Sequence, residues 1–142
     1  MTPLHLSQDS QTQLLQLAKK TLYAHLQQTP RPNLEDLGIP LTDELEQELG
    51  AFVTLRQHGD LRGCIGCMES TEPLHHTISQ YAINSAVSDH RFSPVTIEDY
   101  PSLTFEISVL GPRIDVSGYS DIDINRHGIV LAKHGRSALF LP

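Results

Sequence analysis

The chain of 142 residues fits a single domain, and its 39% hydrophobic and 19% charged residues exclude a disordered acidic chain. Its net charge of −7 and its lack of Trp argue against a nucleic-acid partner, because phosphate binding needs clustered positive charge and base stacking needs aromatic side chains. No apolar run reaches the roughly 20 residues of a membrane span and the N-terminus lacks the pattern of a signal peptide, so we expect a cytoplasmic protein with no membrane partner.

Two helices are predicted ahead of the first strand. Ser7 has the character of an N-cap, and the helix after it carries an apolar stripe at i, i+4 spacing, formed by Leu14, Ala18, Leu22 and Leu26. The Pro30 region ends this helix. A second, short helix is predicted over 43–49, with Gly50 as the residue that ends it.

A strand pair and a third helix are predicted next. The run 51–57 has the composition of a buried strand, and His58-Gly59 supplies a tight turn into a second strand over 61–65. A helix starts near Pro73 and places one apolar face on Leu74, Ile78, Ala82 and Ala86. The small residues on this helix predict close packing against a sheet.

The second half of the chain adds further strands. Residues 103–109 alternate between apolar and polar side chains, which indicates a half-buried strand. The runs 128–133 and 137–141 predict a second hairpin around His134-Gly135. Strand pairs separated by helices, without regular βαβ alternation, predict an α+β fold with a mainly antiparallel sheet and packed helices.

The stretch Leu61-Arg-Gly-Cys-Ile-Gly-Cys67 holds the residues best suited to chemistry. Cys64 and Cys67 form a C-x-x-C, but a redox dithiol usually opens a helix and this one follows a strand. A zinc site would need two more ligands, and the nearest pair, His75 and His76, would point about 100° apart on a helix. The dithiol and the zinc site are therefore minor alternatives, and we expect no metal and no cofactor.

Cys64 is the stronger candidate as a nucleophile. Arg62 lies two residues earlier, so strand alternation predicts both side chains on one face, where the guanidinium would stabilise a thiolate. Gly63 and Gly66 would leave main-chain amides open for a substrate. His127, at a turn before a strand, is the best candidate for a general acid or base. A buried structural cysteine on a central strand explains Cys64 equally well.

Six segments of the chain carry a family resemblance. They are Leu61-Arg-Gly-Cys-Ile-Gly66, Gly50-Ala-Phe-Val-Thr-Leu55, Asp89-His-Arg-Phe-Ser-Pro94, Glu106-Ile-Ser-Val-Leu110, His127-Gly-Ile129 and Leu139-Phe-Leu-Pro142. In the same order along the chain, these segments resemble the AMMECR domain family, protein A of the AmmeMemoRadiSam system, whose signature hexapeptide corresponds to Leu61-Arg-Gly-Cys-Ile-Gly66. They cover about two thirds of the chain. In this family a small hydroxyl residue usually stands where Cys67 stands here, which weakens a functional reading of C-x-x-C.

The resemblance implies an α+β fold in which two sub-domains border a cleft that contains the hexapeptide. It also implies a cytosolic protein encoded beside a Memo-like protein and a radical SAM protein, which are the expected partners. The family has no settled reaction, and its members continue past the Leu-Pro segment. Residues 1–142 are therefore expected to form one AMMECR-like domain that is truncated at its C-terminal end.

Three hypotheses follow for the function. In the first, the chain is a cysteine-dependent enzyme with the catalytic residues Cys64, Arg62 and His127, and with binding residues at Leu61, Gly63, Ile65, Gly66, Asp89, Arg91 and Glu106. In the second, it is a non-catalytic ligand-binding or adaptor module for the Memo-like and radical SAM partners. In the third, the hexapeptide mainly specifies the fold.

Overall fold

The computed structural model describes residues 6–112, 115, 116, 118 and 120, together with the backbone of 129–133 and 136–140. The chain divides into two compact units, Met1–Gly111 and Pro112–Pro142.

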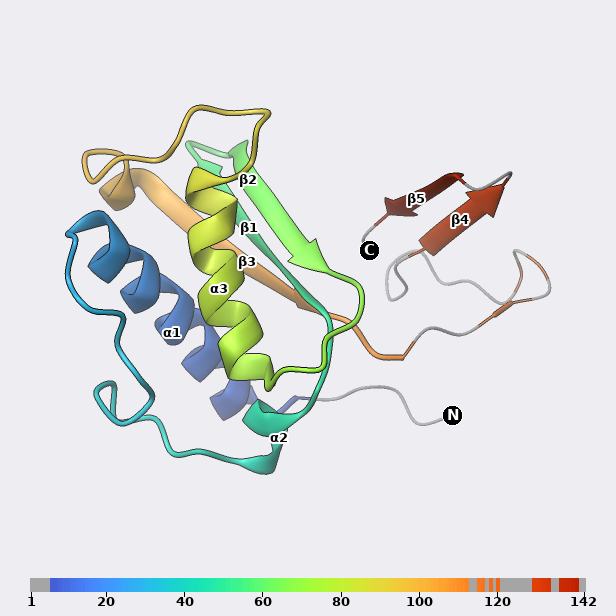
Figure 1. The fold of residues 1–142 in the computed structure, drawn as a ribbon, viewed down its shortest axis with the longest axis horizontal. Helices are drawn as coiled ribbons and strands as arrows, with labels where there is room; N and C mark the ends of the chain where they lie inside the picture. The colour runs from blue at the N-terminus through green and yellow to red at the C-terminus, as the bar shows by residue number, and fades with distance from the viewer. Residues whose placement is uncertain are drawn as a thin grey trace. The chain divides into compact units, whose positions relative to one another are not determined.

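The first unit is an α+β structure, as the sequence predicts (Figure 1). Its strands form one antiparallel sheet in the order β2-β1-β3. In chain order, its elements are α1 (Gln8–Leu26), α2 (Asp43–Glu46), β1 (Ala51–Gln57), β2 (Asp60–Cys67), α3 (Leu74–Val87), the 3-10 turn η1 (Tyr100–Ser102) and β3 (Leu103–Val109).

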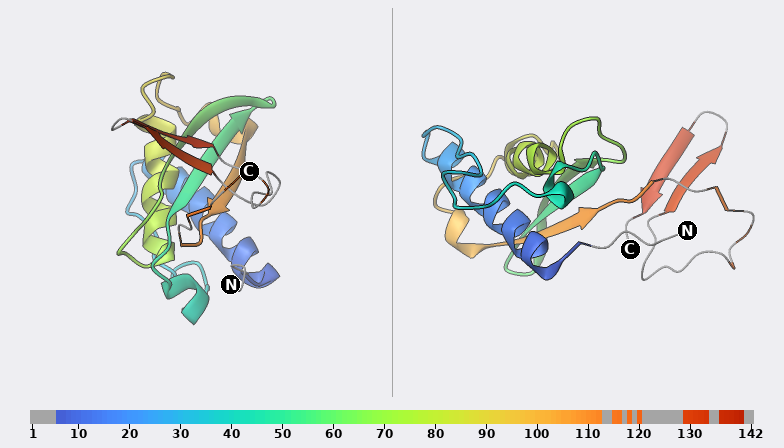
Figure 2. Two further views of the ribbon diagram at one scale, coloured as in Figure 1. Left: turned by 90° about the vertical axis from the view of Figure 1, so that its right-hand side faces the viewer. Right: turned by 90° about the horizontal axis from the view of Figure 1, so that it is seen from below.

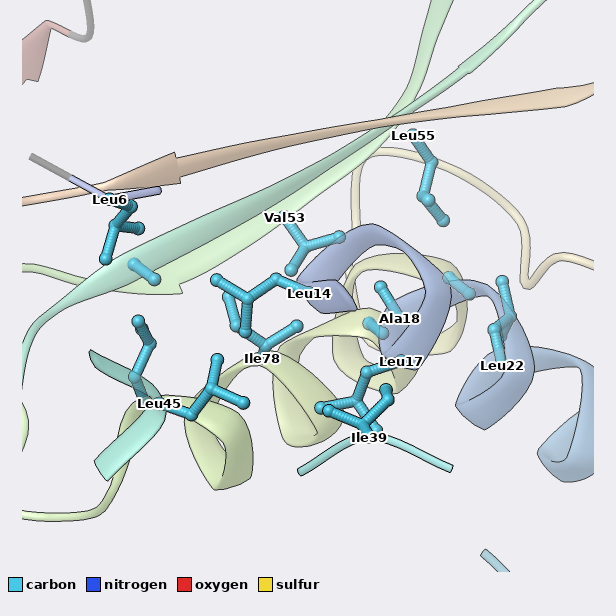
Figure 3. Packing of buried hydrophobic residues seen from close by; sticks show 14 of the residues in the cluster. Leu6, Leu14, Leu17, Ala18, Leu22, Ile39, Leu45, Val53, Leu55 and Ile78 are labelled. Carbon is cyan, nitrogen blue, oxygen red and sulfur yellow. The ribbon is translucent and has the colours of Figure 1, made fainter. Parts of the chain in front are cut away.

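Helices α1 and α3 pack side by side on one face of this sheet, here called the inner face (Figures 1 and 2). Side chains from both helices, from the inner face and from the segments around α2 meet in one apolar core, as Figure 3 shows for Leu14, Leu22, Leu45, Val53, Leu55 and Ile78 among others. All six of these side chains are almost fully buried. The opposite face, here called the outer face, carries the intervening residues of the strands, including Thr54 and Arg56 of β1, Cys64 and Gly66 of β2, and Thr104 and Glu106 of β3.

Helix α1 begins where the sequence predicts. The side chain of Ser7 accepts a hydrogen bond from the Ser10 backbone N–H, which satisfies one of the free amides of the first turn. The Glu44 carboxylate accepts from the Ser7 amide and hydroxyl and from the Ser10 hydroxyl, so it fastens α2 to this helix end. The stripe of apolar residues on α1 then faces the core.

The second helix is shorter than the predicted 43–49. It ends at Glu46, because Gln47 adopts an extended backbone with φ −60° and ψ 142° and its carbonyl accepts the Leu74 amide at 2.8 Å. Gly50 therefore does not end a helix. A Cβ on Gly50 would lie 2.2 Å from the Met68 carbonyl oxygen, so this glycine permits a close approach between two chain segments.

The turn between β1 and β2 has the predicted position. His58 and Gly59 have φ values of 53° and 85°, the left-handed pair that a two-residue hairpin turn needs. Beyond the turn the ladder contains a bulge: Arg56 pairs with Leu61 and Leu55 pairs with Gly63, so Arg62 has no partner on β1. Strand β2 then continues to Cys67, two residues past the predicted end.

In the second unit, β4 (Ile129–Lys133) and β5 (Arg136–Phe140) form an antiparallel pair, which confirms the predicted second hairpin. Its turn residues His134 and Gly135 lie outside the described residues. Across the described part of the chain, no helix is both long enough and apolar enough to span a membrane.

Candidate functional site

The hexapeptide lies on β2, at one edge of the three-stranded sheet. Its residues alternate between the two faces: Gly63 and Ile65 pair with the buried residues Leu55 and Val53, whereas Cys64 pairs with Thr54 on the outer face. The side chain of Cys64 is half-buried and its thiol is free. The site therefore lies on the side of the sheet away from α1 and α3.

Helix α3 approaches the hexapeptide very closely at Ser85. A Cβ on Gly63 would lie 1.9 Å from the Ser85 carbonyl oxygen, so only glycine fits there. The buried Ser85 hydroxyl donates to Val53 O at 2.7 Å and accepts from Ile65 N at 2.9 Å, which places it between β1 and β2. The close packing predicted from the small residues of α3 is thus present.

Gly66 is explained by a similar close approach to the neighbouring strand. A Cβ on Gly66 would lie 2.2 Å from the Ala51 carbonyl oxygen. The space beside Gly63 and Gly66 is therefore filled by the protein itself. The Cys64 and Ile65 amides are also engaged, by Asp89 and Ser85 respectively. The expectation that these main-chain amides are open to a substrate is wrong.

The thiol of Cys64 contacts the hydroxyl of Thr54. Their Sγ and Oγ1 atoms lie 3.1 Å apart, and either atom can be the donor. Thr54 is only 8% exposed even though it lies on the outer face. The sequence analysis did not identify Thr54 as a site residue.

An ion pair in the loop after α3 holds the backbone of Cys64. The Asp89 carboxylate accepts from Cys64 N at 3.0 Å and from Arg91 Nη2 and Nε at 2.8 and 3.0 Å, and Arg91 Nη2 reaches the Cys64 carbonyl oxygen at 3.5 Å. Hydrogen bonds from Arg91 hold the pKa of the buried Asp89 well below its usual range, aided by the Cys64 amide and opposed by burial. Both residues were predicted site residues, and the structure brings them to the backbone of Cys64.

Arg62 lies elsewhere, contrary to the expectation from strand alternation. Because Arg62 is the bulged residue, the two-residue spacing to Cys64 does not place both side chains together. Its guanidinium donates to the carbonyl oxygens of Ser93 at 2.6 Å and Pro94 at 3.4 Å, and lies 3.5 Å from Asp99. The cation whose charge interacts with the Cys64 side chain is instead Arg91, whose pKa is raised mainly by Asp89 and to a smaller degree by Cys64.

Two other predicted residues flank the site. Glu106 of β3 pairs with Thr54 across the sheet, so it lies in the same row as Cys64 but one strand further away. Its carboxylate accepts from Arg56 Nε at 3.0 Å in an exposed ion pair. Leu61 is half-buried opposite Arg56. The predicted acid or base His127 lies outside the described residues.

Cys67 lies on the inner side of the sheet, since it pairs with the buried Ala51 and stands three residues from Cys64. It lines a groove of about 660 Å³ together with His75 and Tyr81. Burial raises the pKa of Tyr81, and the neighbouring Cys67 is a second, smaller cause of the same shift. The two cysteines therefore belong to different environments, which speaks against a shared dithiol.

Comparison with known proteins identifies the family of this chain and supports its fold. The AMMECR1 family model matches residues 15–142. A protein of Methanothermobacter thermautotrophicus is 34% identical to this chain, and the match covers 96% of this chain and 73% of that protein. Protein MK0488 of Methanopyrus kandleri is 35% identical, and the match covers 91% of this chain and 65% of that protein. The crystal structure of the uncharacterized protein PH0010 from Pyrococcus horikoshii, 31% identical, matches with a TM-score of 0.80 over 96% of this chain and 70% of that one. The chain belongs to the AMMECR1 family.

Proposed function

We propose that this AMMECR1-family chain is a cysteine-dependent enzyme of the AmmeMemoRadiSam system in which Cys64 is the nucleophile. The observation that carries the proposal is the environment of Cys64: a free, half-buried thiol beside a buried hydroxyl, on a backbone held by the Asp89–Arg91 pair. A fixed main chain limits the directions in which the thiol can point, which favours attack along one direction.

The chemistry follows from the thiolate. The sulfur forms a bond to an electrophilic carbon of the substrate, and the leaving group departs with the electron pair of the broken bond. Arg91 supplies positive charge beside the Cys64 main chain, with Nη2 3.5 Å from its carbonyl oxygen. In this proposal the thiol proton passes to solvent, and His127 is the general acid that protonates the leaving group. Both described cysteines are free, which fits a reducing compartment, and we place the activity in the cytoplasm.

The test is the selective alkylation of Cys64 by iodoacetamide at neutral pH, with Cys67 as the internal control. Tandem mass spectrometry resolves the two cysteines within one tryptic peptide. We expect Cys64 to react at least about tenfold faster than Cys67 and to be protected by small molecules from a cell lysate. A Cys64 that reacts no faster than Cys67 would contradict the proposal.

A ligand-binding or adaptor module is the second candidate. It is favoured by the absence of any histidine hydrogen-bonded to Cys64 among the described residues, and by the exposed Arg56–Glu106 ion pair on the same face. For this function we expect capture of a Memo-like or radical SAM protein to be weakened by Glu106→Arg and unchanged by Cys64→Ser. The enzyme hypothesis expects Cys64→Ser to abolish turnover and leave any such capture intact.

A further inference from the structure

The hydroxyl of Thr54 contacts the Cys64 sulfur. It lies 3.1 Å from Sγ, in the middle of β1 and 8% exposed. A buried hydroxyl costs free energy unless it is paired. Among the hydrogen bonds of the described residues, this side chain makes only the one to Cys64. Thr54 and Cys64 therefore satisfy each other.

The sheet fixes this contact from both strands. The Cys64 amide is turned away from β1 towards Asp89, so Thr54 and Cys64 form a pair without ladder hydrogen bonds, the type in which facing side chains come closer. Threonine is branched at Cβ, which restricts the rotation that would carry its hydroxyl away. The hydroxyl is thus held where the sulfur lies.

We propose that Thr54 is a positioning residue for the Cys64 nucleophile, whose hydroxyl donates a hydrogen bond to the thiolate. This inference rests on the proposed function. When the thiol gives its proton to solvent, the Thr54 O–H becomes the donor and the sulfur the acceptor, so the hydrogen bond survives deprotonation with its direction fixed. In the attack that follows, the sulfur uses another lone pair to form the bond to carbon.

Other charged groups surround the pair and stay unchanged in the test variants. Asp89 and Arg91 hold the Cys64 main chain from the loop after α3. Arg56 on β1 and Glu106 on β3 lie on the same face of the sheet and pair with each other. A change confined to Thr54 therefore alters the hydrogen bond to the sulfur without altering these charges.

The experiment compares Thr54→Val with Thr54→Ser in the full chain, measuring the rate of Cys64 alkylation by iodoacetamide as a function of pH. Valine keeps the branched shape but removes the donor, so we expect the midpoint of the pH–rate profile to move up by about one pH unit and the rate below that midpoint to fall about tenfold. Serine keeps the donor, so its profile should stay within about 0.3 pH units of the wild type.

The outcomes separate this inference from the proposed function. If wild-type Cys64 reacts selectively and Thr54→Val leaves the midpoint unchanged, the role of Thr54 is wrong and the nucleophile stands. If wild-type Cys64 is unreactive, both fall. Circular dichroism checks the fold of each variant. Should Thr54→Val not fold, Thr54→Ala takes its place, and equal profiles for Thr54→Ala and Thr54→Ser overturn the inference.

Discussion

Replacing Asp89 by Asn tests whether the Asp89–Arg91 pair holds the hexapeptide strand in place. Asp89 is 7% exposed and accepts hydrogen bonds from Cys64 N and from three donors of Arg91, at 2.8 to 3.2 Å. An amide can keep one or two of these bonds but loses the charge. Hydrogen bonds to charged groups contribute about 1.5–3 kcal/mol each, and the Arg91 side chain is 58% exposed, which weakens its share. We expect Asp89→Asn to lower the free energy of unfolding by about 2–3 kcal/mol.

The same pair predicts a pH dependence with a definite sign. The pKa of Asp89 is lowered in the folded chain, so its ionisation stabilises the fold above the unfolded-state pKa of about 4 and this stabilisation is lost as the pH falls towards the folded value. The deficit of Asp89→Asn should therefore shrink by about 1 kcal/mol between pH 5 and pH 3.

Urea denaturation followed by circular dichroism measures both effects. Glu106→Gln is the matched control: its carboxylate is 57% exposed and pairs only at the surface, so we expect a loss below about 0.5 kcal/mol. An Asp89→Asn variant as stable as the wild type at pH 7, or a deficit that does not change with acid, would refute the reasoning.

Three further predictions concern the hexapeptide. Gly63→Ala should lower the free energy of unfolding by at least about 2 kcal/mol, because its Cβ would meet a backbone carbonyl of α3. Gly118→Ala is the control: no atom of the described residues lies within 4 Å of its Cβ position, so thermal melts should show a change below about 0.5 kcal/mol. Arg62→Ala should cost about 1–2 kcal/mol through its lost bonds to the loop after α3 and leave the Cys64 alkylation rate within about twofold; a tenfold fall in that rate would restore its predicted catalytic role. Mild oxidation should give no Cys64–Cys67 disulfide by mass spectrometry, because the side chains leave opposite faces of β2.

The elements of the first unit could be predicted largely because their signals are local. The alternation of 103–109 and the apolar run 51–57 give β3 and β1 with the observed bounds. The capping Ser7 and the His58-Gly59 turn are equally local. The end of α2 could not be predicted from local sequence, because it depends on a hydrogen bond between distant residues, from the Leu74 amide at the start of α3 to the Gln47 carbonyl.

The candidate site was predicted only in part, for a reason of register. Without a bulge, the register set by the pairing of Gln57 with Asp60 would continue along the hairpin. Cys64 would then lie opposite Val53, and its side chain would face the helices. The bulge at Arg62 shifts the ladder by one residue and brings Cys64 opposite Thr54 instead. No local pattern marks such a bulge, so neither the partner of the thiol nor the position of Arg62 follows from the sequence.

The close approach of α3 to Gly63 fixes the position of this bulge along β2. If the bulge lay beyond Cys64 instead of at Arg62, Arg62 would take the place of Gly63 opposite Leu55. Its Cβ would then occupy the position that lies 1.9 Å from the Ser85 carbonyl oxygen. Strand slippage is therefore blocked by α3. Gly63 thus permits only one register of β2 against β1. Its lack of a Cβ, rather than any backbone flexibility, determines the face of the sheet on which the Cys64 side chain lies.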